Sequence, residues 1–141
     1  MIKILILHGP NTNLLGVWGA KYKKNVTLDK VNREIRKYIR EKEIDIKIIQ
    51  SNNEDKAVSY IQKNRKKIDG LIITPGPWQQ SGYIICDLLD LLQIPFITIS
   101  YKKNEKINLL NGIENLNNED IYSSFTNAID KMLEIQTNAK K

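Results

Sequence analysis

The chain has 141 residues, 41% apolar and 27% charged, with a net charge of +6, and this fits one soluble globular domain over residues 1–141. One cysteine, Cys86, excludes an internal disulfide, and one histidine, His8, leaves too few ligands for a zinc site, so we expect neither a metal nor another cofactor. The lysines are scattered without the basic stripe of a nucleic-acid surface, and no apolar run reaches the roughly 20 residues that cross a bilayer, so we expect no nucleic-acid partner and no membrane contact.

The first apolar run, residues 3–7, is typical of a strand buried on both faces of a parallel sheet. It leads directly into a Gly-Pro-Asn turn at residues 9–11, without the small-residue cleavage site of a signal peptide. We therefore expect a cytoplasmic protein. Residues 11–25 come next and are predicted to be irregular.

Helical and strand patterns alternate along the rest of the chain. Thr27 is a candidate N-cap for a helix whose apolar residues recur every three or four positions as far as Ile39. The pattern then predicts a strand at 44–49, a helix around Ala57, Val58 and Ile61, a strand at 71–73, a helix within 78–92, a strand at 94–99, an irregular segment at 100–117 and a last helix capped by Asn118. This alternation implies a doubly wound α/β fold, in which helices cover both faces of a parallel sheet.

Ligands of open parallel sheets bind beyond the carboxyl ends of the strands. Four segments leave such ends in the predicted fold, at residues 11–25, 50–54, 74–80 and 100–117. The fold therefore predicts where a site lies, but not what the site does.

Several short motifs carry a resemblance to a known family. Residues 8–16 read HGPNTNLLG, residues 50–52 read QSN, and residues 69–76 read DGLIITPG. DLL at 87–89 and IP at 94–95 follow in the same register. In this order and at this spacing, over residues 1 to about 100, they resemble the type II 3-dehydroquinate dehydratases. The resemblance implies a flavodoxin-like sheet and a homo-oligomer, either a trimer or a dodecamer.

The resemblance also implies a chemistry, the removal of water from 3-dehydroquinate through an enolate. In the family a tyrosine made acidic by a neighbouring arginine abstracts a proton, and a histidine after the third strand helps the hydroxyl leave as water. The base needs a cation beside it to lower its pKa, the enolate needs hydrogen-bond donors, and the leaving group needs a proton.

Most of these groups are replaced in this chain. Trp18 stands at the arginine position and Lys23 at the tyrosine position, with Tyr22 directly beside it. Thr74 replaces an asparagine and Gln80 a histidine, and neither donates a proton usefully near pH 7. The retained positions are Asn11, Gly76 and Asp87.

The end of the fourth strand has lost its charged groups as well. Thr98 and Ser100 replace a glutamate and a histidine. Ser100 and Tyr101 occupy the segment that binds a carboxylate in the family, so their backbone amides are candidates for binding an anion. Losing several acid, base and stabilising groups together is expected to abolish the parent reaction.

We take Tyr22 as the candidate base, helped by a lysine such as Lys23 or Lys24, with Gln80 and Asn11 as the other candidate catalytic residues. The candidate substrate-binding residues are Trp18, Lys23, Thr74, Gly76, Trp78, Asp87, Ser100 and Tyr101. Packing is the favoured alternative for Trp78, and a structural role at the strand end is favoured for His8.

Three functions remain open on the sequence. The first is a lyase- or isomerase-like enzyme whose pocket, with neutral polar and aromatic walls, takes a small molecule other than 3-dehydroquinate. The second is a non-catalytic binding or partner subunit with the same fold. The third is the parent dehydratase, with Tyr22 and Lys23 supplying an atypical active site.

Overall fold

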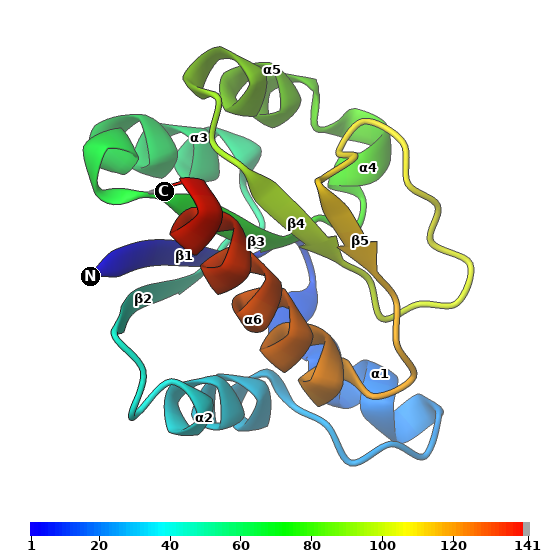
Figure 1. The fold of residues 1–141 in the computed structure, drawn as a ribbon. Helices are drawn as coiled ribbons and strands as arrows, with labels where there is room; N and C mark the ends of the chain where they lie inside the picture. The colour runs from blue at the N-terminus through cyan, green and yellow to red at the C-terminus, as the bar shows by residue number, and fades with distance from the viewer. Residues whose placement is uncertain (140–141) are drawn as a thin grey trace.

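Five parallel strands form one sheet in the order β2-β1-β3-β4-β5 in the computed structural model, which describes residues 1–139 (Figure 1). The strands are β1 (Ile2–His8), β2 (Ile44–Gln50), β3 (Gly70–Thr74), β4 (Phe96–Ile99) and β5 (Glu114–Leu116). This order is that of a flavodoxin-like sheet. It confirms the doubly wound α/β fold, and no helix of the described residues is long and apolar enough to cross a membrane.

Helices cover both faces of the sheet (Figure 1). One layer contains α1 (Leu15–Lys21), α2 (Leu28–Tyr38) and α6 (Ile121–Ala139), and the other contains α3 (Glu54–Asn64), α4 (Trp78–Ser81) and α5 (Tyr83–Leu92). Two 3-10 turns complete the set, η1 (Thr12–Leu14) and η2 (Arg65–Lys67).

The alternation of side chains along β1 explains why two layers form. Ile4 and Ile6 belong to the core beneath α2 and α6, whereas Leu5 and Leu7 belong to the core beneath α3 and α5. Successive side chains of a strand point to opposite faces, so an apolar run buries one set in each layer.

The N-terminal cap of α2 was predicted correctly, whereas that of α6 was not. The Thr27 hydroxyl accepts a hydrogen bond from the Lys30 amide at 3.2 Å, which confirms the predicted cap of α2. The prediction of Asn118 as the cap of the last helix was wrong. That helix begins at Ile121, and the Asp120 carboxylate accepts from the Tyr122 amide at 3.0 Å, where its charge also suits the helix dipole.

The two segments predicted to be irregular both contain regular structure. Residues 11–25 hold η1 and α1, although Gly16 and Gly19 give α1 poor helix propensity. A Cβ on Gly19 would lie 2.6 Å from the Lys24 carbonyl oxygen, so close packing against the following turn requires this glycine. Residues 100–117 hold β5, a three-residue edge strand that pairs with β4 and is too short and polar to show a strand pattern.

Candidate functional site

The carboxyl ends of the neighbouring strands β2, β1 and β3 bring the sequence motifs together. His8 is in register with Gln50 on one side and with Thr74 on the other. The Gly9 amide continues the pairing by donating to the Thr74 carbonyl at 3.0 Å. A Cβ on Gly9 would lie 2.3 Å from the same oxygen, so only glycine allows the two turns to meet.

Asparagine and glutamine side chains hold the first turn in place. The Asn52 carboxamide oxygen accepts from the Asn11 amide at 2.9 Å and from the Gln50 side chain at 3.0 Å. Gln50 also donates to the Gly9 carbonyl at 3.3 Å. The side chains of residues 50–52 therefore hydrogen-bond to the backbone of residues 8–16. Asn11 has a left-handed backbone conformation with φ of 70°.

His8 is buried beneath these turns. One ring nitrogen lies 2.8 Å from the Asn32 carboxamide oxygen, and the ring meets Phe125 edge to face at 5.4 Å. Burial lowers the pKa of His8 to about 4, although the hydrogen bond with Asn32 acts in the opposite direction. The histidine is therefore neutral at physiological pH and packed in the core beneath α2 and α6.

An open cavity of about 640 Å³ lies beside this edge, between α1 and the loop after β4. Trp18, Tyr22 and Tyr101 form its aromatic wall, with ring centroids 5.0 Å apart for Trp18 and Tyr101 and 5.4 Å apart for Trp18 and Tyr22. A second cavity of about 400 Å³ shares Trp18 and Tyr101 and opens toward the start of α6. The Trp18–Tyr101 pair therefore separates two neighbouring hollows.

Lysines surround the larger cavity. Four lysines and only one acidic residue, Glu119, are among its lining residues. The lysines are Lys21, Lys24, Lys102 and Lys103. The Lys24 ammonium lies 5.3 Å from the centroid of the Trp18 ring and donates to the Glu119 carbonyl at 3.3 Å. A pocket with neutral polar and aromatic walls was expected from the sequence. This cavity is instead positively charged, because lysines outside the replaced family positions also line it.

Thr74 does not line the open cavity. Its hydroxyl is buried and has no hydrogen-bond partner within residues 1–139. His8, Thr12 and Tyr101 help to enclose it in a gap without room for a water molecule. Tyr101 lines both this gap and the open cavity.

The backbone at the end of β4 differs from what was expected of an anion-binding loop. The Ser100 amide donates to the Leu116 carbonyl at 2.9 Å, so it is not available to an anion. The Ser100 amide is occupied because β5 pairs with β4. The sequence pattern did not predict β5 as a strand.

The two adjacent glutamines of α4 have opposite environments. Gln80 is exposed, whereas Gln79 is buried and makes three hydrogen bonds to the loop before β5. It donates to the Leu110 carbonyl at 2.9 Å and accepts from the amides of Leu110 and Asn108 at 2.9 and 3.0 Å. Sequence reasoning missed Gln79, because only the helical phase of α4 distinguishes it from its neighbour.

Glu105 is a second residue that sequence reasoning missed. One of its carboxylate oxygens is buried without a hydrogen-bond partner in the described part of the chain. Burial raises the pKa of Glu105, while Lys102 and a hydrogen bond from the Gly76 backbone act to lower it. Burial also raises the pKa of Tyr101, and the nearby Glu105 raises it further. Glu105 therefore places a carboxyl group between two predicted site residues, Gly76 and Tyr101.

The remaining predicted site residues are not gathered around one space. Trp78 is 4% exposed and packs in the core beneath α3 and α5, in agreement with a packing role. Asn11, Lys23, Gln80 and Asp87 are all exposed, and none of them lines either cavity beside Trp18.

Tyr22 does line the larger cavity. Its side chain is 54% exposed, and the Lys21 ammonium, rather than that of Lys23, is found 5.6 Å from its ring centroid. Lys23 has a left-handed backbone with φ of 57° in the turn after α1. Within residues 1–139, no group of three histidine, cysteine or acidic side chains is arranged to hold a metal ion.

Known proteins match the part of the chain that contains these motifs. The family model of dehydroquinase class II matches residues 2–109. A 3-dehydroquinate dehydratase from Dictyoglomus turgidum is 38% identical over 109 residues, which cover 74% of this chain and 75% of that protein. Another from Prochlorococcus marinus is 35% identical over 99 residues, covering 70% of this chain and 67% of that protein.

Solved structures agree on the fold. A type II dehydroquinase from Butyrivibrio crossotus superposes with a TM-score of 0.79 at 24% identity, covering 93% of this chain and 97% of that one. A 3-dehydroquinate dehydratase-like protein from Bifidobacterium longum gives a TM-score of 0.72 at 14% identity, covering 96% and 98%. By its family-model match and its curated relatives, the chain belongs to the class II dehydroquinase family.

Proposed function

We propose that this protein is a lyase- or isomerase-like enzyme that acts on a small anionic molecule other than 3-dehydroquinate. The observation that carries the proposal is the cavity of about 640 Å³, which combines an aromatic wall with four lysines. A volume of this size is typical of small-molecule sites. Clustered positive charge raises the local concentration of anionic ligands and holds carboxylate or phosphate groups.

The same cavity supports a role for Tyr22 in proton abstraction. Its ring is close to both Trp18 and the Lys21 ammonium. Lys21 is the cation found beside Tyr22, where the resemblance expects an arginine, and Trp18 supplies an apolar wall.

The choice of a substrate other than 3-dehydroquinate rests on the replaced groups. Thr74 and Gln80 stand where the family carries an asparagine and the histidine that helps the hydroxyl leave. Thr74 is buried and Gln80 is exposed, and neither of them lines the cavity. The parent reaction therefore lacks its proton donor at these positions.

A proton-exchange assay tests this proposal even while the product is unidentified. The protein is incubated in D₂O with a panel of small hydroxy-keto and hydroxy acids, and deuterium incorporation beside the carbonyl is followed by NMR. We expect exchange with at least one anionic compound and its loss in Tyr22→Phe. Exchange that is unchanged in Tyr22→Phe would contradict the role of Tyr22, and no exchange across the panel would favour a non-catalytic binding protein.

The parent dehydratase is the second candidate, because the curated relatives at 35–38% identity carry that name. Formation of the enone product from 3-dehydroquinate distinguishes it directly by absorbance. Turnover above background that depends on Tyr22 would establish this second function in place of the first.

We also propose that the protein is cytoplasmic and assembles as a homo-oligomer, such as the trimer or dodecamer that the family resemblance implies. The outer face of α5 supports assembly, because Tyr83, Ile84 and Leu91 are between 54% and 70% exposed. Exposed apolar groups on one helix face are typical of an interface. Light scattering after size exclusion tests this, and a monomeric mass would contradict it.

A further inference from the structure

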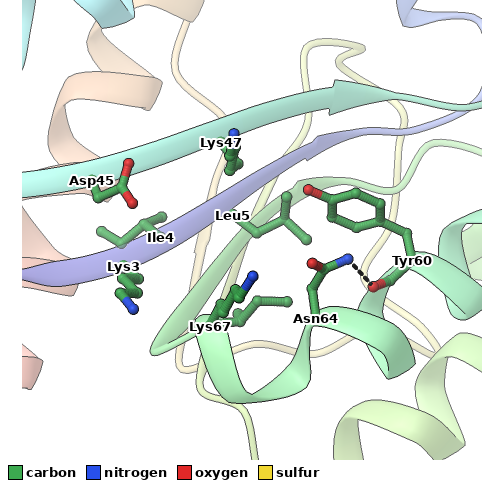
Figure 2. A pocket seen from close by; sticks show the side chains of 9 residues that line it. Lys3, Ile4, Leu5, Asp45, Lys47, Tyr60, Asn64 and Lys67 are labelled. Atoms are coloured by element: carbon green, nitrogen blue, oxygen red, sulfur yellow. Dashed lines mark hydrogen bonds between the residues drawn. The ribbon is translucent and has the colours of Figure 1, made fainter.

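A separate cavity of about 270 Å³ lies on the α3 side of β1 and β2 (Figure 2). It is lined from the strands by Lys3 and Lys47 and from the turn after α3 by Lys67. Lys3 lies five residues before His8 on β1, roughly 16 Å along the strand. The cavity is therefore distinct from the candidate site at the carboxyl ends of the strands.

The strand register explains why charged side chains face this cavity. Lys3 pairs with Asp45, and Leu5 pairs with Lys47, so these four side chains point to the same face of the sheet. On β2 the other face carries Ile44, Ile46 and Ile48, which belong to the core beneath α2 and α6. On the face of β2 that points toward α3, the first residues are therefore charged, and the core beneath α3 does not cover them.

The charges of the cavity are not balanced. Three lysines, from β1, β2 and η2, line the cavity together with one carboxylate residue, Asp45, so the lining residues carry a net charge of +2. None of the three lysines forms an ion pair with a residue of the described chain, where the ion pair found is Lys131 with Glu114. The nearby Asp69 carboxylate accepts from the Lys3 backbone amide at 2.8 Å and does not line the cavity.

Two neutral polar side chains complete the lining. Figure 2 shows Tyr60 reaching from α3 toward the strands, with Asn64 one helical turn away. Asn64 donates to the Tyr60 carbonyl at 2.9 Å, which fixes its carboxamide. The buried Leu5 side chain contributes apolar surface between them and the sheet.

We propose that this cavity binds the phosphate group of a small phosphate monoester. A phosphate monoester carries about −1.5 to −2 charges at pH 7, which complements the lining charge of +2. A lysine ammonium is a compact point charge, so several lysines can approach the oxygens of a tetrahedral phosphate from different directions. A planar carboxylate is better matched by the two parallel N–H groups of an arginine. The Tyr60 hydroxyl adds a neutral hydrogen-bond donor at the same cavity.

The test is a titration of the ¹⁵N-labelled full chain with glycerol 3-phosphate at constant ionic strength. We expect saturable shifts of amide signals around Leu5, Lys47 and Asn64. Succinate, a dianion that carries two carboxylates instead, is expected to bind at least about tenfold more weakly, since it lacks the tetrahedral group. Shifts that do not saturate, or equal binding of succinate, would overturn the assignment to a phosphate.

A charge-matched pair of variants locates the site. Lys47→Gln with Lys67→Gln is expected to weaken glycerol 3-phosphate binding by about tenfold or more, because it removes two of the three positive charges that line the cavity. Lys37→Gln with Lys42→Gln removes the same charge from α2 and the turn that follows, and is expected to change the affinity less than about twofold. Equal losses in the two double variants would show a general charge effect and overturn the site. All four lysines are exposed, so both proteins are expected to fold.

Discussion

The Gln79 side chain both donates to the carbonyl of Leu110 and accepts from its amide, each at 2.9 Å. This pairing copies the pattern of two adjacent strands and ties α4 to the loop that leads into β5. The amide of Asn108 adds a third bond at 3.0 Å. The loop that borders the candidate site is therefore held by one buried carboxamide.

Replacing Gln79 by alanine is expected to lower the free energy of unfolding by about 2–4 kcal/mol, because several buried backbone groups lose their partners. Urea unfolding followed by circular dichroism measures this. Gln80→Ala, one residue along the same helix but exposed, is the matched control and is expected to stay within about 0.5 kcal/mol. Equal effects of the two substitutions would contradict the anchoring role of Gln79.

His8 is expected to make stability depend on pH. Its folded pKa of about 4 is below its ordinary value of 6.5, so its contribution is fully present above pH 6.5 and is lost as pH falls through 4. A shift of this size corresponds to about 3 kcal/mol. Unfolding measured from pH 7 to pH 4 is expected to show a steeper loss for the natural protein than for His8→Asn. Parallel pH profiles for the two proteins would be inconsistent with a buried neutral histidine.

Glu105 is expected to show the opposite dependence. Burial raises its folded pKa above the ordinary value of 4.5, so its charge costs stability increasingly as pH rises through the folded pKa. Glu105→Gln keeps an acceptor for the Gly76 backbone and removes the charge. It is expected to be more stable than the natural protein at pH 7, with the difference vanishing near pH 4. The exposed Glu119→Gln provides the control, and a Glu105→Gln protein that is less stable at both pH values would reject this assignment.

Gly9 provides a test of how the two turns meet. Gly9→Ala places a Cβ against the Thr74 carbonyl oxygen, where the ideal position is 2.3 Å away, so the backbone must move. We expect a loss of several kcal/mol or failure to fold. Gly16→Ala is the control, because its nearest neighbour is the Thr27 methyl group at 3.2 Å and alanine favours the helix. Thermal unfolding ranks the two, and a reversed order would contradict the close approach.

The strands were predictable because their composition and burial agree. Residues such as Ile72 and Ile73 are fully buried in β3, and a run of this kind admits few alternatives to a central parallel strand. The β2-β1-β3-β4 part of the sheet thus follows from the sequence pattern and the family motifs. By contrast, α1 and β5 depend on tertiary contacts, as the packing of Gly19 against Lys24 and the pairing of β5 with β4 show.

The site was less predictable than the fold. Comparison of family positions identified Trp18, Tyr22 and Tyr101, and these three residues line one cavity. It named Lys24 as a helper of Tyr22, but it did not identify Lys21, Lys102, Lys103 or Glu105 as site residues. It also could not distinguish the buried Gln79 from the exposed Gln80, since that difference arises only from the orientation of α4.

The most direct test is one NMR experiment, in which ¹⁵N-labelled protein is titrated with 3-dehydroquinate and the signals of protein and compound are followed in the same tube. We expect saturable shifts around Trp18, Tyr22 and Lys102, because the lysine-lined cavity holds a carboxylate, and no conversion of the compound. Conversion to the enone product, or shifts confined to Asn11, Gln80 and Ser100, would contradict this account.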